Sequence, residues 1–184
     1  MSGEPKARSH QDALAAYLDE LLQPEPAAQP VPEPGVLLPC GRVLQDDPRY
    51  YLFAAAGLSL AIPAVRVSAE QPFAGAVTGD EGAVVKRLSR PAGEDVPVFD
   101  LARLMLPPSA AVLNRPLQQR ASTLVMLDDG QWALAAEGAG DLEALDREQV
   151  CWRGQQATRA WLAGTVAARR LALLDLDVLA GMLP

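Results

Sequence analysis

The sequence predicts an all-β fold, a barrel or a sandwich, divided into two similar lobes. Apolar segments after residue 49 are short and are separated by glycine or proline, which is typical of short strands. Little of this region has the 3.6-residue periodicity of a helix. An apolar strand, an aspartate and a short helix follow one another twice, at 96–106 with Asp100 and at 171–183 with Asp177. Aspartate is a common N-cap residue, so both aspartates are predicted to begin their helices.

The composition predicts a packed globular protein and limits its partners. Of the 184 residues 49% are hydrophobic, and the formal net charge is −7. The negative charge argues against nucleic acid or an anionic membrane as the partner. No apolar run reaches membrane-spanning length, and residues 1–10 lack the apolar region of a secretory signal. Cys40 and Cys151 lack metal-ligand spacing and are expected to be reduced thiols in a cytoplasmic protein.

Residues 1–22 are predicted to form a tail that contains an amphipathic helix. Ser9 and Asp12 have the spacing of a capping box, and one apolar stripe follows at Leu14, Tyr17, Leu18, Leu21 and Leu22. Residues 23–48 are rich in proline, which predicts an extended linker. A helix this short is marginal alone in water, so it docks either on its own domain or on a partner protein. The linker favours a partner.

The folded domain is predicted to span residues 49–184, with a first lobe that begins with a hairpin around Gly57. Val65 and Val67 continue the alternation of apolar and polar side chains out to Glu70. The strands of this lobe are predicted at 50–53, 58–62, 83–88 and 96–101.

A second lobe is predicted to open at residue 123. Asp129-Gly130 is a strong signal for a type I′ hairpin turn between two strands. Trp161 to Gly164 is predicted to be a strand end that breaks at the glycine. The remaining predicted elements are strands at 123–127, 131–136 and 171–176, a loop with a further strand within 141–150, and a polar reversal at 167–170.

Residues 50–183 resemble CheW-like domains, the adaptor modules of bacterial chemotaxis arrays. The motifs that carry the resemblance occur in the order of that family: Tyr51-Leu52-Phe53, Ala61-Ile62-Pro63 with Val65 and Val67, Pro97-Val98-Phe99-Asp100-Leu101, Glu137-Gly138, Leu162-Ala163-Gly164, and Leu173-Leu174-Asp175-Leu176-Asp177 with Leu179. The resemblance implies two small five-stranded β-barrels side by side. It also implies that the domain binds the kinase CheA and the tips of methyl-accepting chemoreceptors.

The tail and the linker are more similar to ParP-like proteins, which are CheW-related scaffolds of chemotaxis arrays at the cell pole. Trp161-Leu162-Ala163-Gly164 contributes to this similarity. It implies that the apolar stripe of the tail helix binds a ParA-like ATPase of the ParC type. The alternative is an ordinary CheW coupling protein between receptors and CheA.

The resemblance also indicates which residues contact CheA or receptors: Val65, Val67, Arg90, Phe99, Leu101, Trp161 and Leu162. Arg90 is included because residues 88–93 replace the Asn-Leu-Arg-Gly segment of the family with a longer one, in which only this arginine can take the equivalent role. Trp132 is predicted to be a core residue. Trp161 is either an aromatic anchor for a partner or a second core tryptophan.

The sequence offers no catalytic constellation. His10 is the only histidine and lies in the tail, so no serine–histidine or cysteine–histidine arrangement can be built on the domain. Gly138-Ala139-Gly140 lacks the lysine of a phosphate-binding loop, and a helix cap accounts for Asp177 more simply than a cation site shared with Asp175. We therefore expect a binding protein without metal or cofactor. A further alternative is a regulatory module modified at His10.

Overall fold

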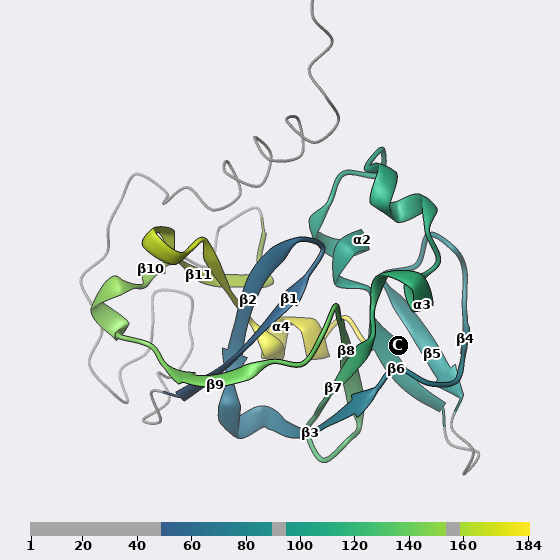
Figure 1. The fold of residues 1–184 in the computed structure, drawn as a ribbon, viewed down its shortest axis with the longest axis horizontal. Coiled ribbons are helices and arrows are strands. Elements are labelled where there is room, and N and C mark those ends of the chain that lie inside the picture. Colours follow the sequence, from purple (N-terminus) through teal and green to yellow (C-terminus); the bar gives the residue numbers. More distant parts are fainter. Residues whose placement is uncertain (1–48, 90–94, 154–158) are drawn as a thin grey trace, which may run out of the picture.

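The computed structural model describes residues 49–89, 95–153 and 159–184 (Figure 1). Two six-stranded sheets with a few short helices make up this part of the chain, which confirms the all-β prediction. Each sheet has one strand more than the five that the resemblance implies. The predicted tail helix and proline-rich linker lie outside the described residues. None of the helices in the described segments has the length and apolar character needed to cross a membrane.

The first sheet has the strand order β10-β11-β12-β2-β1-β9. Its strands are β1 (Arg49–Ala55), β2 (Leu58–Pro63), β9 (Asp141–Ala144), β10 (Cys151–Trp152), β11 (Leu162–Val166) and β12 (Leu171–Leu174). The second sheet has the order β3-β7-β8-β6-β5-β4. Its strands are β3 (Val67–Pro72), β4 (Ala76–Thr78), β5 (Val85–Ser89), β6 (Asp95–Phe99), β7 (Thr123–Leu127) and β8 (Trp132–Ala136).

The helices are short and connect or cap the strands. The α-helices are α2 (Leu101–Met105), α3 (Leu117–Arg120) and α4 (Leu176–Ala180), and the 3-10 helices are η1 (Ala64–Arg66), η2 (Ala111–Asn114), η3 (Arg147–Gln149) and η4 (Ala167–Arg169). Three of them begin at aspartates: α2, η3 and α4. Asp100 accepts a hydrogen bond from the amide of Arg103 and caps α2, as predicted.

The cap of the last helix corrects the prediction. Asp175 accepts hydrogen bonds from the amides of Asp177 and Val178 and begins α4. The predicted cap Asp177 instead lies in the first turn, and its carboxylate is exposed. The strand predicted to reach residue 176 therefore ends at Leu174. The pattern of leucine and aspartate did not distinguish two candidate caps placed two residues apart.

The two sheets do not correspond to two halves of the chain. The strand orders match position by position when they are read as β9-β1-β2-β12-β11-β10 and β3-β7-β8-β6-β5-β4. In both sheets a hairpin pairs in parallel with the strand that precedes a capped helix, β2 with β12 and β8 with β6. The chain is thus a structural repeat, and each repeat inserts its hairpin into the sheet of the other. The expectation that a separate second lobe opens at residue 123 is wrong, because β7 pairs with β3 and β8.

Four clusters of buried apolar residues occur in the described part of the chain, and the interleaving of the sheets produces three of them. Each sheet has a smaller core of its own. That of the second sheet surrounds Leu124 and Met126, and that of the first surrounds Leu171 and Leu173. The largest lies between the sheets and joins residues of both, including Phe53, Leu60, Val125, Trp132 and Leu134. Strands β7, β8, β11 and β12 are buried on both faces, because each contributes to two cores. This explains why their sequences are nearly continuous apolar runs.

Tight turns connect the hairpins. The loop between β7 and β8 has positive φ at Asp128, Asp129 and Gly130, which confirms the predicted hairpin, although the left-handed region begins one residue earlier than Asp129. Gly164 does not break its strand. Strand β11 continues through it to Val166, with a register shift against β12 between Leu162 and Gly164. The glycine therefore marks a bulge.

Candidate functional site

The 3-10 helix η1 is one of the two connections between the sheets, the other being the β8–β9 loop. It carries an exposed apolar side chain. Val65 is 66% exposed. Val67, which begins β3, is partly buried against the central core. In Figure 1, η1 lies at the lower side of the molecule, between β2 and β3. A valine presented on the connection between two lobes is suited to contact a partner, although a single exposed apolar residue is also common on protein surfaces.

Arg66 fixes η1 to both neighbouring regions. Its Nε and Nη2 donate to the two carboxylate oxygens of Asp128, in the β7–β8 turn, at 2.5 and 2.7 Å. Its Nη1 donates to Asp177 Oδ1, on α4, at 2.8 Å. Trp132 Nε1 adds a bond of 2.8 Å to the Asp128 carboxylate. The bond from Arg66 holds the pKa of Asp128 below its ordinary value, against the opposing effect of burial, so this carboxylate stays ionised.

Tyr51 makes a second link between the sheets. Its hydroxyl donates to the carboxylate of Glu70 on β3 and accepts the amide of Gly140 at 2.9 Å. Burial is the main cause that raises the pKa of Tyr51, and the bond to Glu70 adds to it. The residue opposite Tyr51 on β9 is Leu142, which is 66% exposed. Leu142 and Val65 therefore flank the start of β1 on elements that both contact this strand.

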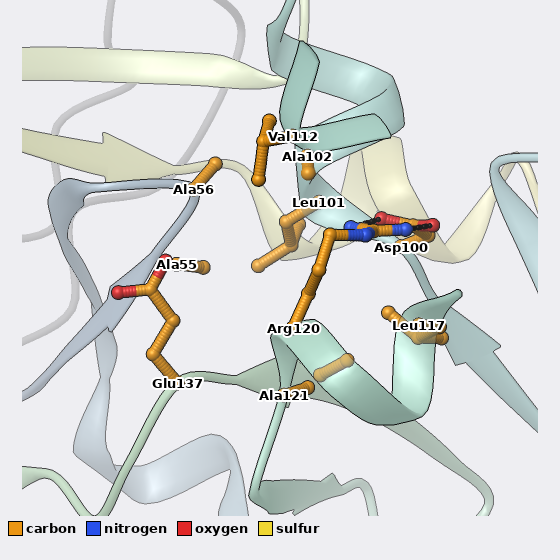
Figure 2. Close-up of a pocket in the computed structure, with 11 residues that line it drawn as sticks. Ala55, Ala56, Asp100, Leu101, Ala102, Val112, Leu117, Arg120, Ala121 and Glu137 are labelled. Carbon is orange, nitrogen blue, oxygen red and sulfur yellow. Dashed lines mark hydrogen bonds and ion pairs between the residues drawn. The ribbon is translucent and has the colours of Figure 1, made fainter. Parts of the chain in front are cut away.

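A small pocket lies at the β1–β2 turn, beside α2 and α3. Ala55, Ala56, Asp100, Leu101, Ala102, Val112, Leu117, Arg120, Ala121, Ala135 and Glu137 line it. Figure 2 shows Glu137 pointing along one side toward the turn, while Arg120 reaches Asp100 on the other. Glu137 Oε1 accepts the amide of Gly57 at 2.9 Å. Alanines form much of the wall, and its charged side chains bond within the protein: Arg120 to Asp100, and Glu137 to the amide of Gly57.

Asp100 is the centre of a buried group of charges behind this pocket. Its carboxylate is fully buried and accepts two hydrogen bonds from Arg120, at 2.8 and 2.5 Å. Arg103 Nε lies 3.5 Å from it. Burial lowers the pKa of nearby Lys86, and Asp100 opposes that change; the Lys86 ammonium donates to the carbonyl of Asp80 at 2.7 Å. The Arg120–Asp100 pair joins α3 to the N-terminus of α2 and is a structural link.

Comparison with solved structures finds a similar fold. The scaffolding protein TtCheW of Thermoanaerobacter tengcongensis matches with a TM-score of 0.50 and 11% sequence identity, over 70% of this chain and 84% of that protein. The chain has a CheW-like fold. The sequence itself matches no protein-family model and no curated protein. At this identity the likeness concerns the fold, and the partners of the chain have to be argued from its own surface.

The CheW-like fold places the predicted contact residues in different environments. Val65 is exposed and Val67 is half-buried, whereas Phe99, Leu101 and Leu162 are almost completely buried in the central core. Trp161 is 8% exposed and belongs to the same core, which decides between its two readings in favour of a core residue. Trp132 is buried as predicted. Arg90 lies outside the described residues, as do Leu14, Tyr17, Leu18, Leu21 and Leu22 of the tail.

Sequence reasoning missed three features of this surface. Arg66 stands between the two selected valines, and its charge within an apolar segment was a usable signal. Leu142 lies in the stretch 141–150, which was predicted to be a loop with a further strand; the structure places it on β9 opposite Tyr51 and exposed. The partner of Asp100 had no local signal, because Arg120 lies on a different element, α3, twenty residues away.

Proposed function

We propose that the chain is a non-catalytic chemotaxis adaptor that brings the kinase CheA together with chemoreceptor tips. The observation that carries the proposal is the CheW-like fold, shared with the scaffolding protein TtCheW. The described surface supports a binding role, because large apolar side chains are exposed on it, Val65 and Leu142 most of all.

The receptor tip is proposed to contact the exposed side chains of Val65 and Leu142 and the partly buried Val67. Val65 and Val67 lie on either side of Arg66, whose ion pairs hold η1 in one conformation. A surface that is ordered before binding loses less conformational entropy when a partner docks. Apolar side chains exposed on such a surface gain free energy when the partner removes them from water.

The finer proposal is that this adaptor is a polar scaffold of the ParP-like type. In this view the CheW-like domain binds CheA and receptors, and the apolar stripe of residues 14–22 binds a ParA-like ATPase of the ParC type. An amphipathic helix on a proline-rich linker is a common means of reaching a separate partner. This part of the chain lies outside the described residues, so the support is the sequence pattern alone.

A binding experiment on the full chain tests the adaptor role. Val65→Ser is expected to weaken capture of receptor signalling domains at least tenfold, because truncating a central contact commonly has an effect of this size. Met182→Ser is the matched control, since Met182 is also an exposed apolar residue and follows α4, outside η1. If both variants bind receptors equally well, η1 is not part of the receptor interface. Failure of the unaltered chain to bind either CheA or receptors would contradict the adaptor proposal itself.

A second experiment separates the polar scaffold from an ordinary coupling protein. Leu14→Glu combined with Leu18→Glu places charges on the apolar stripe of the tail. For a ParP-like scaffold this change abolishes capture of the ATPase and leaves CheA binding intact. Ala15→Glu combined with Ala16→Glu adds the same charge beside the stripe and serves as the control. If neither double variant changes any partner, the chain is an ordinary coupling protein.

A further inference from the structure

The hairpin β1–β2 belongs to a sheet whose other strands all come from the end of the chain. Residues 49–52 pair with 141–144 of β9, and residues 59–61 pair with 171–173 of β12. Side chains of the hairpin, such as Phe53 and Leu60, fill the central core. The hairpin therefore makes its contacts with distant segments, and η1 is its covalent connection to the strand that follows.

This arrangement has the features of a segment that two copies of a chain can exchange. The hairpin is the first element of the described domain, so moving it requires a change at only one connection. That connection is the three-residue helix η1, and short hinge loops favour exchange of the element they hold. In an exchanged dimer each hairpin would find the same partners, β9, β12 and the central core, in the other copy. The contacts of the monomer are then regained, and exchange costs little.

Arg66 is the residue that keeps the hinge closed. It is the last residue of η1, and its guanidinium bonds to Asp128 of the second sheet and to Asp177 of α4. Extending residues 64–66 into one continuous strand would pull Arg66 away from at least one of these carboxylates. The two ion pairs thus stabilise the closed monomer. Exchange keeps the contacts of the hairpin, but these ion pairs are not among them.

We propose that this chain forms a hairpin-exchanged dimer with a second copy of itself, and that Arg66 acts as the clamp that favours the monomer. Each dimer carries two Val65 surfaces and two tails. A bivalent protein binds an array of repeated partners more tightly than either single contact allows. The exchange follows from the topology and does not depend on the identity of those partners.

Paired cysteines distinguish an exchanged dimer from any other dimer. Tyr50→Cys with Glu143→Cys joins β1 to β9, and Ala54→Cys with Ser59→Cys joins β1 to β2 within the hairpin; both pairs are direct neighbours in register, as disulfides require. Cys40→Ser and Cys151→Ser remove the native thiols. The full chain is unfolded in denaturant, refolded at low and high concentration, oxidised, and examined by light scattering and non-reducing electrophoresis. The 50/143 pair is expected to give covalent dimers at high concentration, and the 54/59 pair only covalent monomers.

The clamp is tested in the same assay. Arg66→Ala is expected to raise the dimer fraction severalfold, and Asp177→Asn, which removes one of the two ion pairs, to raise it less. Arg169→Ala is the control, because it breaks an exposed two-bond ion pair with Glu143 that is not on the hinge. Circular dichroism confirms that each variant is folded. The exchange proposal is overturned by chains that remain monomeric at every concentration, Arg66→Ala and Asp177→Asn included, or by dimers in which the 50/143 pair closes within one chain. A dimer fraction that neither hinge variant raises overturns the clamp.

Discussion

Asp100 carries a buried charge that holds two helices together. Its carboxylate is fully buried, caps α2 and accepts two hydrogen bonds from Arg120, which is itself buried. Replacing it by asparagine keeps the size and a capping oxygen but removes the negative charge. Arg120 would then remain as a buried cation close to Arg103 and Lys86.

We therefore expect Asp100→Asn to lower the free energy of unfolding by about 3–5 kcal/mol, the usual cost of leaving one partner of a buried ion pair alone. Urea denaturation of the purified variant measures this change. Asp95→Asn is the control, because Asp95 is exposed and its carboxylate accepts a hydrogen bond from Ser89, and an exposed polar bond contributes little. A loss below 1 kcal/mol for Asp100→Asn would show that the pair is not needed.

The raised pKa of Tyr51 predicts how the stability of the protein depends on pH in the alkaline range. Burial and the bond to Glu70 raise the pKa of Tyr51 above its ordinary value of 10.0. The folded state therefore retains a proton that the unfolded chain releases, so this stabilisation is complete below pH 10 and is lost as the pH rises above it.

Tyr51→Phe is expected to lower the free energy of unfolding by about 1–3 kcal/mol at pH 7, because Glu70 and the amide of Gly140 each lose a partner. The free energy of unfolding, measured from pH 7 to 11, is also expected to fall less steeply above pH 10 in this variant than in the unaltered chain. Tyr50→Phe provides the comparison. Burial also raises the pKa of this neighbouring tyrosine, so its loss is expected to reduce the alkaline sensitivity while leaving the bonds to Glu70 and Gly140 in place. A variant with unchanged alkaline sensitivity would contradict the role assigned to the hydroxyl.

At the scale of elements, Gly140 is needed where β9 begins. A Cβ on this residue would overlap the carbonyl of Leu52 and the ring of Tyr51. Neither can move without disturbing β1. Gly138, two residues earlier, has open space around the same position.

Gly140→Ala is expected to cost about 3 kcal/mol or more, the upper part of the range for overpacking, because backbone is the neighbour. Gly138→Ala is expected to change stability by less than about 1 kcal/mol. Thermal unfolding of the two variants gives the comparison directly. Similar melting temperatures would mean that β9 can shift along β1 without loss.

Elements with local signals were the ones that the sequence could predict. The hairpin at Asp129-Gly130 and the cap at Asp100 follow from a few adjacent residues, and both are present. Strands β7 and β12 were predictable because burial on two faces leaves continuous apolar runs. Strand β4 and helices η2 and α3 were missed, since Ala76–Thr78 and Ala111–Arg120 show neither a strand alternation nor a helical stripe. Contacts such as Tyr51 with Glu70 join residues on different sheets and leave no local pattern.

At the scale of the whole molecule, Asp128 links acid pH to the junction of the two sheets. The bond from Arg66 lowers the pKa of Asp128 from its ordinary value of 3.8. The contribution of the ionised Asp128 to stability is therefore complete above pH 3.8, and it is lost as the pH falls through the lower pKa of the folded state.

Asp128→Asn is expected to reduce the acid sensitivity of unfolding below pH 4 and to lower stability at pH 7. Chemical denaturation at a series of pH values from 2 to 7 measures both effects. Asp129→Asn, at the exposed neighbouring position of the turn, is the control. An acid profile that is the same in the two variants would show that the Arg66 contact does not stabilise the junction.

The interleaved topology lay beyond sequence reasoning. The two occurrences of strand, aspartate and helix correctly indicated a repeat, but they suggested two consecutive lobes. Which sheet a hairpin joins depends on the direction the chain takes after β2 and β8. At the first of these points that direction is set by η1 and its ion pairs with Asp128 and Asp177, residues 62 and 111 positions away.

The position of the hairpin β1–β2 also constrains how the protein is made. A ribosome releases the N-terminal segments first, yet the first sheet cannot close until β12 has emerged. The second sheet is complete as soon as β8 is available, so the lobe that starts later in the chain is finished earlier. Until translation ends, the nascent hairpin presents Phe53 and Leu60 without their final neighbours, and this is the period in which chaperones would be most useful to the newborn chain.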